Sequence, residues 1–457
     1  MRPSIAVIQP YWDFWEATAP FDLRADRRRL LDEAIRAIGN DVHVTVSGLI
    51  TSAEDAVELA ARCANVDAII VLTTMAAPSA TSMELIDRLP RTPVVVWALS
   101  QRSGLAEDFA HSDITTQGST VGAPMVASAL ARAGRVFDVV LTTLAEPRAA
   151  MDAARQAAAA GRLRRTTLLK IGTPIAGYTS VDATDEDLRE LGVTTVRIPP
   201  EEVAARSRGV SIDSVNMLKE QIYSEFDVDP LVSGEALERS VRVEAVLAEL
   251  LAEHHAEAGT LNCHGPALRF GEEIGIAPCL ALGRLTTRGI PWSCTGDVVT
   301  AIAMLTVQAL GHATLYHEIE AVDHDSDEVL LANTGEHDLR LCGPTRPRLV
   351  PDVWYEDDNM TGPCALFSLP EGPASLVGFA LAGGPRWVVA EGRFTGRSAI
   401  RTGTPNGAFR FASGHVREAW SRWASTGVTH HSAATNALVA ADIQSVAHHL
   451  AATAIVV

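Results

Sequence analysis

Two apolar runs in the first third of the chain, 68-AIIVL-72 and 93-PVVVWAL-99, decide its fold class. Uninterrupted runs of apolar and β-branched residues are typical of strands in parallel sheets, which helices cover on both faces. Helical spacing at residues 24–38 and 53–63, each followed by a strand-like run, gives the βαβ rhythm of such a sheet. Neither a G-x-G-x-x-G nor a P-loop motif follows these strands, so the sequence supports neither kind of nucleotide site. The pattern predicts an open, doubly wound α/β domain.

The rest of the chain changes pattern twice. An alanine-rich helix at residues 148–161 leads into a second set of alternating strands and helices, which includes the strand-like run 259–263 and the polar loop NCHGP. From residue 314, apolar and polar residues alternate between turns rich in Pro, Gly, Asn and Asp, which is typical of an antiparallel barrel or sandwich. We therefore predict an α/β protein with two doubly wound parallel-sheet domains followed by an antiparallel β-barrel-like domain. The predicted boundaries are 1–147, 148–312 and 313–457.

The composition limits the classes of function. The 457 residues include 38 basic and 56 acidic side chains, and the net charge of −18 argues against a non-specific nucleic-acid binder, which needs a basic surface. No apolar run approaches the roughly 20 residues of a membrane span. The N-terminus reads as a strand rather than a signal peptide, so we expect a cytoplasmic protein without a membrane partner. The six cysteines form no C-x-x-C pair, which argues against zinc-finger and disulfide frameworks.

The first candidate motif is 292-WSCTGDVVTAIAML-305. Thr295 and Asp297 directly precede an almost wholly apolar helix, and the N-terminus of a helix favours anionic groups. An equally good interpretation is that one of these two residues is simply the N-cap of the helix. Trp292 can likewise either line a pocket or pack in the core.

The second motif is 315-LYHEIEAVD-323. If it forms a strand, Tyr316, Glu318 and Glu320 share one face, and their neighbours share the other. Glu318 can then point into a cleft, whereas Glu320 fits better on a solvated acidic face.

The third motif, 427-GVTHHSAATNA-437, contains the adjacent residues His430 and His431. Neighbouring residues of a strand point to opposite sides, so we expect at most one of these histidines to face a given site. Carboxylates and an imidazole from distant parts of the chain suit a divalent ion such as Mn²⁺. Such an ion polarises a carbonyl group, and a carboxylate beside it can carry a proton between neighbouring carbons.

These motifs together resemble the L-fucose/L-arabinose isomerase superfamily. The likeness covers most of the chain and rests on 118-GSTVGAPMVASALARAGRVFDVV-140, 163-LRRTTLLKIGTPIAGYTSV-181, 293-SCTGDVVTAIAMLTVQALGHATLYHE-318 and 427-GVTHHSA-433. The resemblance implies two α/β domains before a β-barrel-like domain, and an aldose–ketose isomerase that uses Mn²⁺ or a similar ion and an enediol route. It also implies a homo-oligomeric assembly.

Carried over by position, Glu318 matches a metal-binding carboxylate of the family that also takes part in proton transfer. One of the two adjacent histidines matches the C-terminal metal ligand, and we favour His430, with His431 as a candidate for proton transfer. A second family carboxylate falls at Thr295, and a threonine cannot act as a carboxylate base. Asp297 lies two residues further on and is a further candidate for proton transfer, although it already corresponds to an aspartate of the family motif.

Two further groups of residues complete the candidate site. In the arabinose isomerase branch a histidine follows the next strand, and here 332-ANTGEHD-338 offers Glu336 or His337, of which we take His337 as a metal ligand. The residues expected on the substrate side are His264, Trp292 and Trp15.

The sequence therefore predicts a divalent-metal-dependent isomerase of a sugar or polyol derivative. Because Thr295 replaces a carboxylate, two alternatives stay open. One is a related metal-dependent epimerase or lyase that needs a single carboxylate, and the other is a catalytically silent sugar-binding protein.

Overall fold

The computed structural model describes residues 3–39, 42–104, 107–333, 335–352 and 362–457. The chain divides into two compact units. The first comprises residues 1–164 and 445–451, and the second comprises residues 165–444 and 452–457. The two units are taken in turn.

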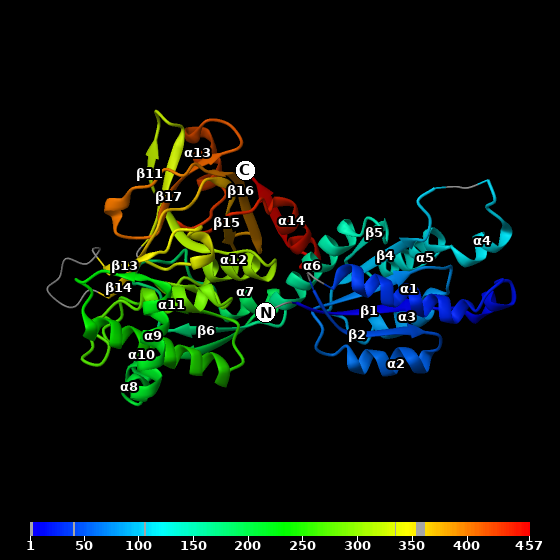
Figure 1. Cartoon of the computed structure of the whole chain (residues 1–457), viewed down its shortest axis with the longest axis horizontal. Coiled ribbons are helices and arrows are strands. Elements are labelled where there is room, and N and C mark those ends of the chain that lie inside the picture. Colours follow the sequence, from blue (N-terminus) through cyan, green and yellow to red (C-terminus); the bar gives the residue numbers. More distant parts are fainter. Residues whose placement is uncertain (1–2, 40–41, 105–106, 334, 353–361) are drawn as a thin grey trace. The chain divides into compact units, whose positions relative to one another are not determined.

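A five-stranded parallel sheet forms the centre of the first unit, in the order β2-β1-β3-β4-β5 (Figure 1). Its strands are β1 (Ser4–Pro10), β2 (His43–Ile50), β3 (Ala68–Thr73), β4 (Val94–Ser100) and β5 (Phe137–Thr143). All residues of β3 are buried, as the continuous apolar sequence predicts for a strand covered on both faces.

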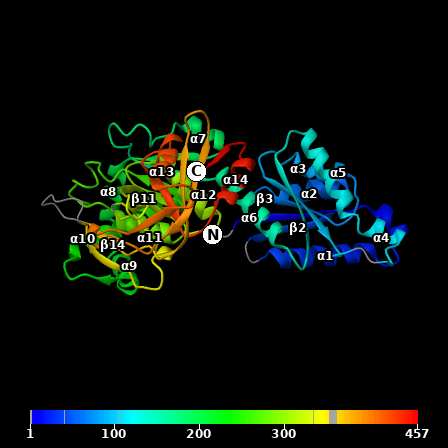
Figure 2. The same cartoon turned by 90° about the horizontal axis from the view of Figure 1, so that it is seen from above.

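Helices cover both faces of this sheet (Figure 2). One face packs against α2 (Ala53–Arg62), α3 (Ser79–Ile86) and α5 (Ser119–Arg132). The other packs against α1 (Leu23–Ile38) and the alanine-rich α6 (Arg148–Leu163). The unit also contains η1 (Asp13–Ala17) and α4 (His111–Thr116).

The second unit begins with a four-stranded parallel sheet in the order β10-β9-β6-β7. Its strands are β6 (Thr167–Ile171), β7 (Thr194–Ile198), β9 (Ala258–Leu261) and β10 (Trp292–Ser293). The helices of this part are α7 (Asp185–Leu191), α8 (Pro200–Arg208), α9 (Ile212–Glu225), α10 (Gly234–Glu253), α11 (Cys279–Thr287) and α12 (Val298–Ala309). Helix α12 is buried on every side, because it packs against the parallel sheet and also against strands of the barrel.

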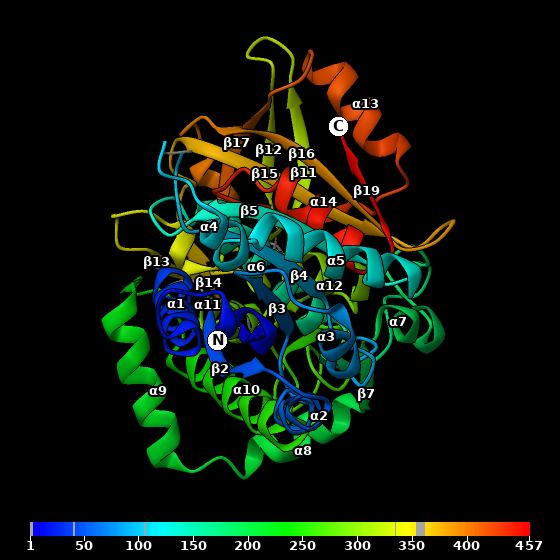
Figure 3. The same cartoon turned by 90° about the vertical axis from the view of Figure 1, so that its right-hand side faces the viewer.

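The barrel is a closed antiparallel ring of six strands, in the order β15-β18-β11-β12-β17-β16, which the pairing of β15 with β16 closes (Figure 3). The strands are β11 (Leu315–Asp323), β12 (Glu328–Ala332), β15 (Gly372–Ala380), β16 (Arg386–Phe394), β17 (Asn406–Phe411) and β18 (His431–Thr435). Strand β19 (Thr453–Val456) adds to β16 in parallel. A smaller sheet contains β8 (Asp227–Val228), β13 (Arg348–Pro351) and β14 (Pro363–Leu366). The remaining elements are η2 (Leu339–Leu341), η3 (Ile400–Thr402), α13 (Val416–Ser425) and α14 (Ala440–His449).

The predicted fold class, parallel-sheet α/β domains followed by an antiparallel barrel, is confirmed. The three predicted domain boundaries stay a prediction. For the site, the decisive feature is that β11 and β18 are neighbours in the barrel, although more than a hundred residues separate them in the sequence.

Candidate metal centre

Strand register brings the second and third motifs together. Strands β11 and β18 pair in antiparallel orientation, and Glu318 lies directly opposite His431 in this pairing. Side chains of directly opposed residues lie on the same face of a sheet and within contact distance. Accordingly, Glu318 Oε1 lies 3.1 Å from His431 Nε2.

His430 joins the same group. Its Nε2 lies 3.6 Å from Glu318 Oε1, and the centroids of the two histidine rings are 3.9 Å apart. One ligand atom from each of Glu318, His430 and His431 fits within 4.8 Å of the others, which is close enough to hold a single metal ion. The expectation that at most one histidine faces the site is wrong. Strand β18 begins at His431, so the strict alternation of a strand does not extend to His430.

Asp297 holds His431 in this orientation. The aspartate is fully buried and caps α12, accepting a hydrogen bond from the backbone N–H of Thr300 at 2.8 Å. Its second oxygen lies 2.7 Å from His431 Nδ1 and 2.8 Å from the Thr300 hydroxyl. A carboxylate bound to Nδ1 fixes the tautomer and ring plane of a histidine, and it leaves Nε2 as the free ligand atom. The N-cap interpretation and the site interpretation of Asp297 are therefore compatible.

The charges in this group are strongly coupled. Burial lowers the pKa of His431, but its hydrogen bonds to Asp297 and Glu318 outweigh burial and raise this pKa to about 9. Burial raises the pKa of Glu318, yet the hydrogen bond to His431 and the charges of both histidines lower it below the ordinary value. Burial and the nearby His431 cation lower the pKa of His430. The group therefore holds an anionic carboxylate between two imidazoles of different basicity.

A second carboxyl group lies beside Glu318. The pairing of β11 with β12 is irregular between Ile319 and Ala321, which marks a bulge at Glu320. Bulges are common next to active sites, where they redirect a side chain. The Glu320 carboxyl hydrogen-bonds to Glu318, and burial together with the Glu318 charge raises its pKa to about 7. Glu320 is exposed, as the sequence predicts, but its contact with Glu318 was not expected, because a bulge cannot be read from a single strand.

Thr295, the residue that the sequence resemblance sets in place of a carboxylate, also lies at this site. Its hydroxyl is 3.3 Å from the hydroxyl of Tyr316, whose ring centroid lies 4.6 Å from that of His431. Thr295 has a φ of +55°, which is rare for a β-branched residue. The next residue, Gly296, has a φ of +78°, and a Cβ there would lie 2.7 Å from Pro174 Cα. Such local strain is concentrated at functional sites.

Two of the predicted residues lie elsewhere in the second unit. His337 is buried, with Nδ1 2.9 Å from the carbonyl oxygen of Gly335 and its ring against Phe226. Among the described residues it is not part of the Glu318 group. Trp292 is fully buried, and its ring packs directly on Gly259: a Cβ built on this glycine would lie 2.5 Å from the ring. The core interpretation of Trp292 is the one that fits this packing.

His264 and Trp15 occupy other surroundings. His264 is half-buried beside Cys263, and a hydrogen bond to that cysteine raises the pKa of His264. Trp15 belongs to the first unit, where its indole N–H donates to the carbonyl oxygen of Ala76 at 2.7 Å. A role for either residue on the substrate side stays a prediction.

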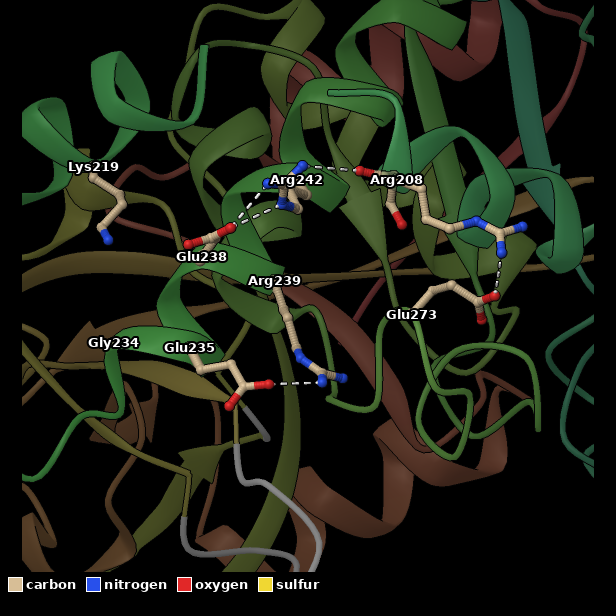
Figure 4. A pocket seen from close by; sticks show the side chains of 9 residues that line it. Arg208, Lys219, Gly234, Glu235, Glu238, Arg239, Arg242 and Glu273 are labelled. Carbon is tan, nitrogen blue, oxygen red and sulfur yellow. Dashed lines mark hydrogen bonds and ion pairs between the residues drawn. The ribbon is translucent and has the colours of Figure 1, made fainter. Parts of the chain in front are cut away.

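A hollow on the surface of the second unit, with a volume of about 570 Å³, offers a different kind of site (Figure 4). Each of its arginines pairs with an acidic neighbour: Arg208 with Glu273, Arg239 with Glu235, and Arg242 with Glu238. Lys219 also lines the hollow, so its four basic residues outnumber its three acidic ones by a single charge.

Two comparisons of the sequence with known proteins found no match. No protein-family model matches the chain, and no curated protein matches it. In the part of the chain that the structure describes, no helix has the length and apolar character needed to cross a bilayer.

Proposed function

We propose that this protein is a divalent-metal-dependent enzyme of the aldose–ketose isomerase type. The observation that carries the proposal is the convergence of Glu318, His430 and His431 within 4.8 Å of one another. The three residues come from two neighbouring barrel strands and the residue just before one of them, so the fold rather than chance proximity positions them.

The donor set fits such an ion. One carboxylate oxygen and two imidazole nitrogens suit Mn²⁺ and similar divalent ions and leave coordination positions open. When bound, a divalent ion would supply Lewis-acid polarisation of a sugar carbonyl held at the same place.

The residues around the ligands have separate tasks in the proposed reaction. Glu318 would hold the cation and would take up or return a substrate proton, as the family resemblance implies. Glu320, in contact with Glu318, is the second carboxyl group within reach of that proton. Asp297 keeps His431 oriented through the 2.7 Å contact with Nδ1. His431, at 3% exposure, excludes water from the inner side of the site, whereas His430, at 41%, lies at its open side.

Thr295 favours a second candidate, a metal-dependent epimerase or a lyase that cleaves a carbon–carbon bond of a polyol. Such reactions need only one carboxylate base, and a threonine hydroxyl 3.3 Å from the Tyr316 hydroxyl supplies none. The chain of Asp297, His431 and Glu318 argues against a silent sugar binder. Burying charged groups costs free energy, and a binding protein without metal has no use for that arrangement.

Metal analysis tests the proposal. Purified protein dialysed against Mn²⁺ should retain about one ion per chain, and Glu318→Gln should retain none. The matched control is Glu371→Gln, which changes an exposed glutamate of the same unit. Equal metal content in wild type and Glu318→Gln would contradict the proposal.

A second experiment separates the reactions. A panel of aldoses and polyols is incubated with the metal-loaded enzyme in ²H₂O and followed by NMR. Formation of a ketose with deuterium at the neighbouring carbon supports the isomerase. Inversion at one carbon, or cleavage into two fragments, supports the second candidate.

A further inference from the structure

Two cysteines form a close pair at the ends of neighbouring strands. Cys263 follows β9 and Cys294 follows β10, and these strands pair in parallel. The two Sγ atoms lie 2.8 Å apart, and both residues are 1% exposed. A disulfide bond is about 2.05 Å long, so the two sulfur atoms need to approach by only roughly 0.8 Å to form one.

We propose that Cys263 and Cys294 are a redox-active thiol pair, which hydrogen peroxide converts into an intrachain disulfide. Both cysteines are free in the reduced protein. A separation of 31 residues hides this pairing in the sequence, where neither residue belongs to a C-x-x-C motif.

The surroundings make Cys263 the attacking sulfur. The hydrogen bond from the Cys294 thiol outweighs burial and lowers the pKa of Cys263 to about 5, with a further contribution from His264. The same hydrogen bond and burial raise the pKa of Cys294, so the proton stays on that sulfur. The thiolate is the reactive form of cysteine. Desolvation by burial raises the pKa of each of the other four cysteines, at positions 63, 279, 342 and 364.

The proposed reaction balances in two steps. The Cys263 thiolate attacks one peroxide oxygen, the O–O bond breaks, and protonation of the leaving hydroxide gives water and a sulfenic acid on Cys263. The Cys294 sulfur then attacks the sulfenic sulfur, the S–O bond breaks, and the thiol proton leaves with the hydroxyl group as a second water. Two electrons pass from the sulfur pair to the peroxide. The buried carboxyl group of Glu336, which contacts Cys294, can relay the proton in the second step.

Cys294 lies in the same turn as Asp297, which orients one residue of the proposed metal centre. The backbone N–H of Asp297 donates to the carbonyl oxygen of Cys294 at 2.9 Å, and Asp297 orients His431. Movement of Cys294 towards Cys263 therefore shifts the support of a metal ligand. This link, unlike the disulfide itself, rests on the proposed metal function.

Peptide mapping of the full-length protein tests the disulfide. Native protein is treated with a stoichiometric amount of hydrogen peroxide, alkylated in denaturant and digested with trypsin without reduction. The expected product is a cross-link between peptides 243–269 and 289–340, two hydrogens lighter than their sum, which reductant separates. Cys279→Ser should leave this cross-link unchanged, and Cys294→Ser should abolish it and leave a sulfenic acid on Cys263.

Two results would overturn the thiol pair: cross-linking of Cys263 to a different cysteine, or oxidation of the more exposed Cys342 while Cys263 and Cys294 stay free. Wild-type protein alone gives this answer, so it does not depend on the folding of a variant. The link to the site is tested by Mn²⁺ titration of oxidised and reduced protein, where we expect at least threefold weaker binding after oxidation. Equal Mn²⁺ affinity with the cross-link present refutes the link alone, and absence of Mn²⁺ binding in both forms refutes the metal function.

Discussion

Replacing Asp297 by asparagine probes the support of the metal centre without removing a metal ligand. Asparagine is as good an N-cap as aspartate, so its oxygen can keep the hydrogen bond from the backbone N–H of Thr300. Its amide NH₂ then faces His431 Nδ1, which lies 2.7 Å from the carboxylate oxygen in the wild type. Two donors cannot share this contact, so the neutral imidazole that a metal ion requires would carry its proton on Nε2, the atom that faces Glu318.

The magnitude follows from this loss of orientation. Removing the outer partner of a ligating histidine typically weakens metal binding by about 10- to 100-fold. At about 1.4 kcal/mol for each tenfold change, this corresponds to about 1.4 to 2.8 kcal/mol. Isothermal titration with Mn²⁺ should therefore show a dissociation constant raised by at least about tenfold for Asp297→Asn.

A matched variant separates orientation from general disturbance. Thr300→Val removes the hydroxyl that contacts the same Asp297 oxygen at 2.8 Å but leaves the His431 contact intact. We expect its Mn²⁺ affinity to stay within about threefold of the wild type. If Asp297→Asn binds Mn²⁺ as tightly as the wild type, or if Thr300→Val loses as much affinity, Asp297 does not orient a ligand.

Three further predictions concern the stability of the folded chain, and each is tested by substitution. His431→Ala leaves the buried Asp297 carboxylate without its partner, so urea denaturation should show a free energy of unfolding lower by about 3 to 5 kcal/mol. His430→Ala, at an exposed position, should lower the free energy of unfolding by less than about 1 kcal/mol. Similar losses in the two variants would contradict the buried pairing of His431 with Asp297. Gly259→Ala places a methyl group 2.5 Å from the ring of Trp292, and the overpacking should cost about 1 to 3 kcal/mol, whereas an unchanged midpoint would contradict that contact. Burial lowers the pKa of His337 to about 4 from an ordinary 6.5, so the unfolded chain binds its proton first and stability falls as pH drops from 6.5 to 4. Between these two pH values His337 should lower the free energy of unfolding by about 3 kcal/mol, and His337→Gln should remove this part of the pH dependence. An unchanged pH dependence in the variant would contradict the lowered pKa of His337.

The fold class follows from sequence because its signals are local. Strands β3 and β4 are continuous apolar runs, which indicate burial on both faces of a sheet. The barrel strands alternate apolar and polar residues, which indicates burial on one face. The pairing of Glu318 with His431 is not local, and composition and periodicity alone do not give it. The family resemblance predicted that Glu318 meets one of the two adjacent histidines and favoured His430, whereas the strand register places His431 directly opposite Glu318.

Two features of the site depend on irregular backbone that the sequence does not show. Glu320 reaches Glu318 through a bulge, and His430 faces the site because it precedes β18. The rule of strand alternation holds for neither residue. The resemblance also proposed His337 as a ligand, and its burial against Phe226 is a feature that only the structure shows. The Cys263–Cys294 pair likewise needs the register of β9 and β10.

Anomalous diffraction at the manganese edge, from crystals grown with Mn²⁺, tests the central claim most directly. We expect a single strong peak within bonding distance of the Glu318 carboxylate and of one ring nitrogen from each of His430 and His431. A peak at other residues, or no peak at saturating Mn²⁺, would contradict it.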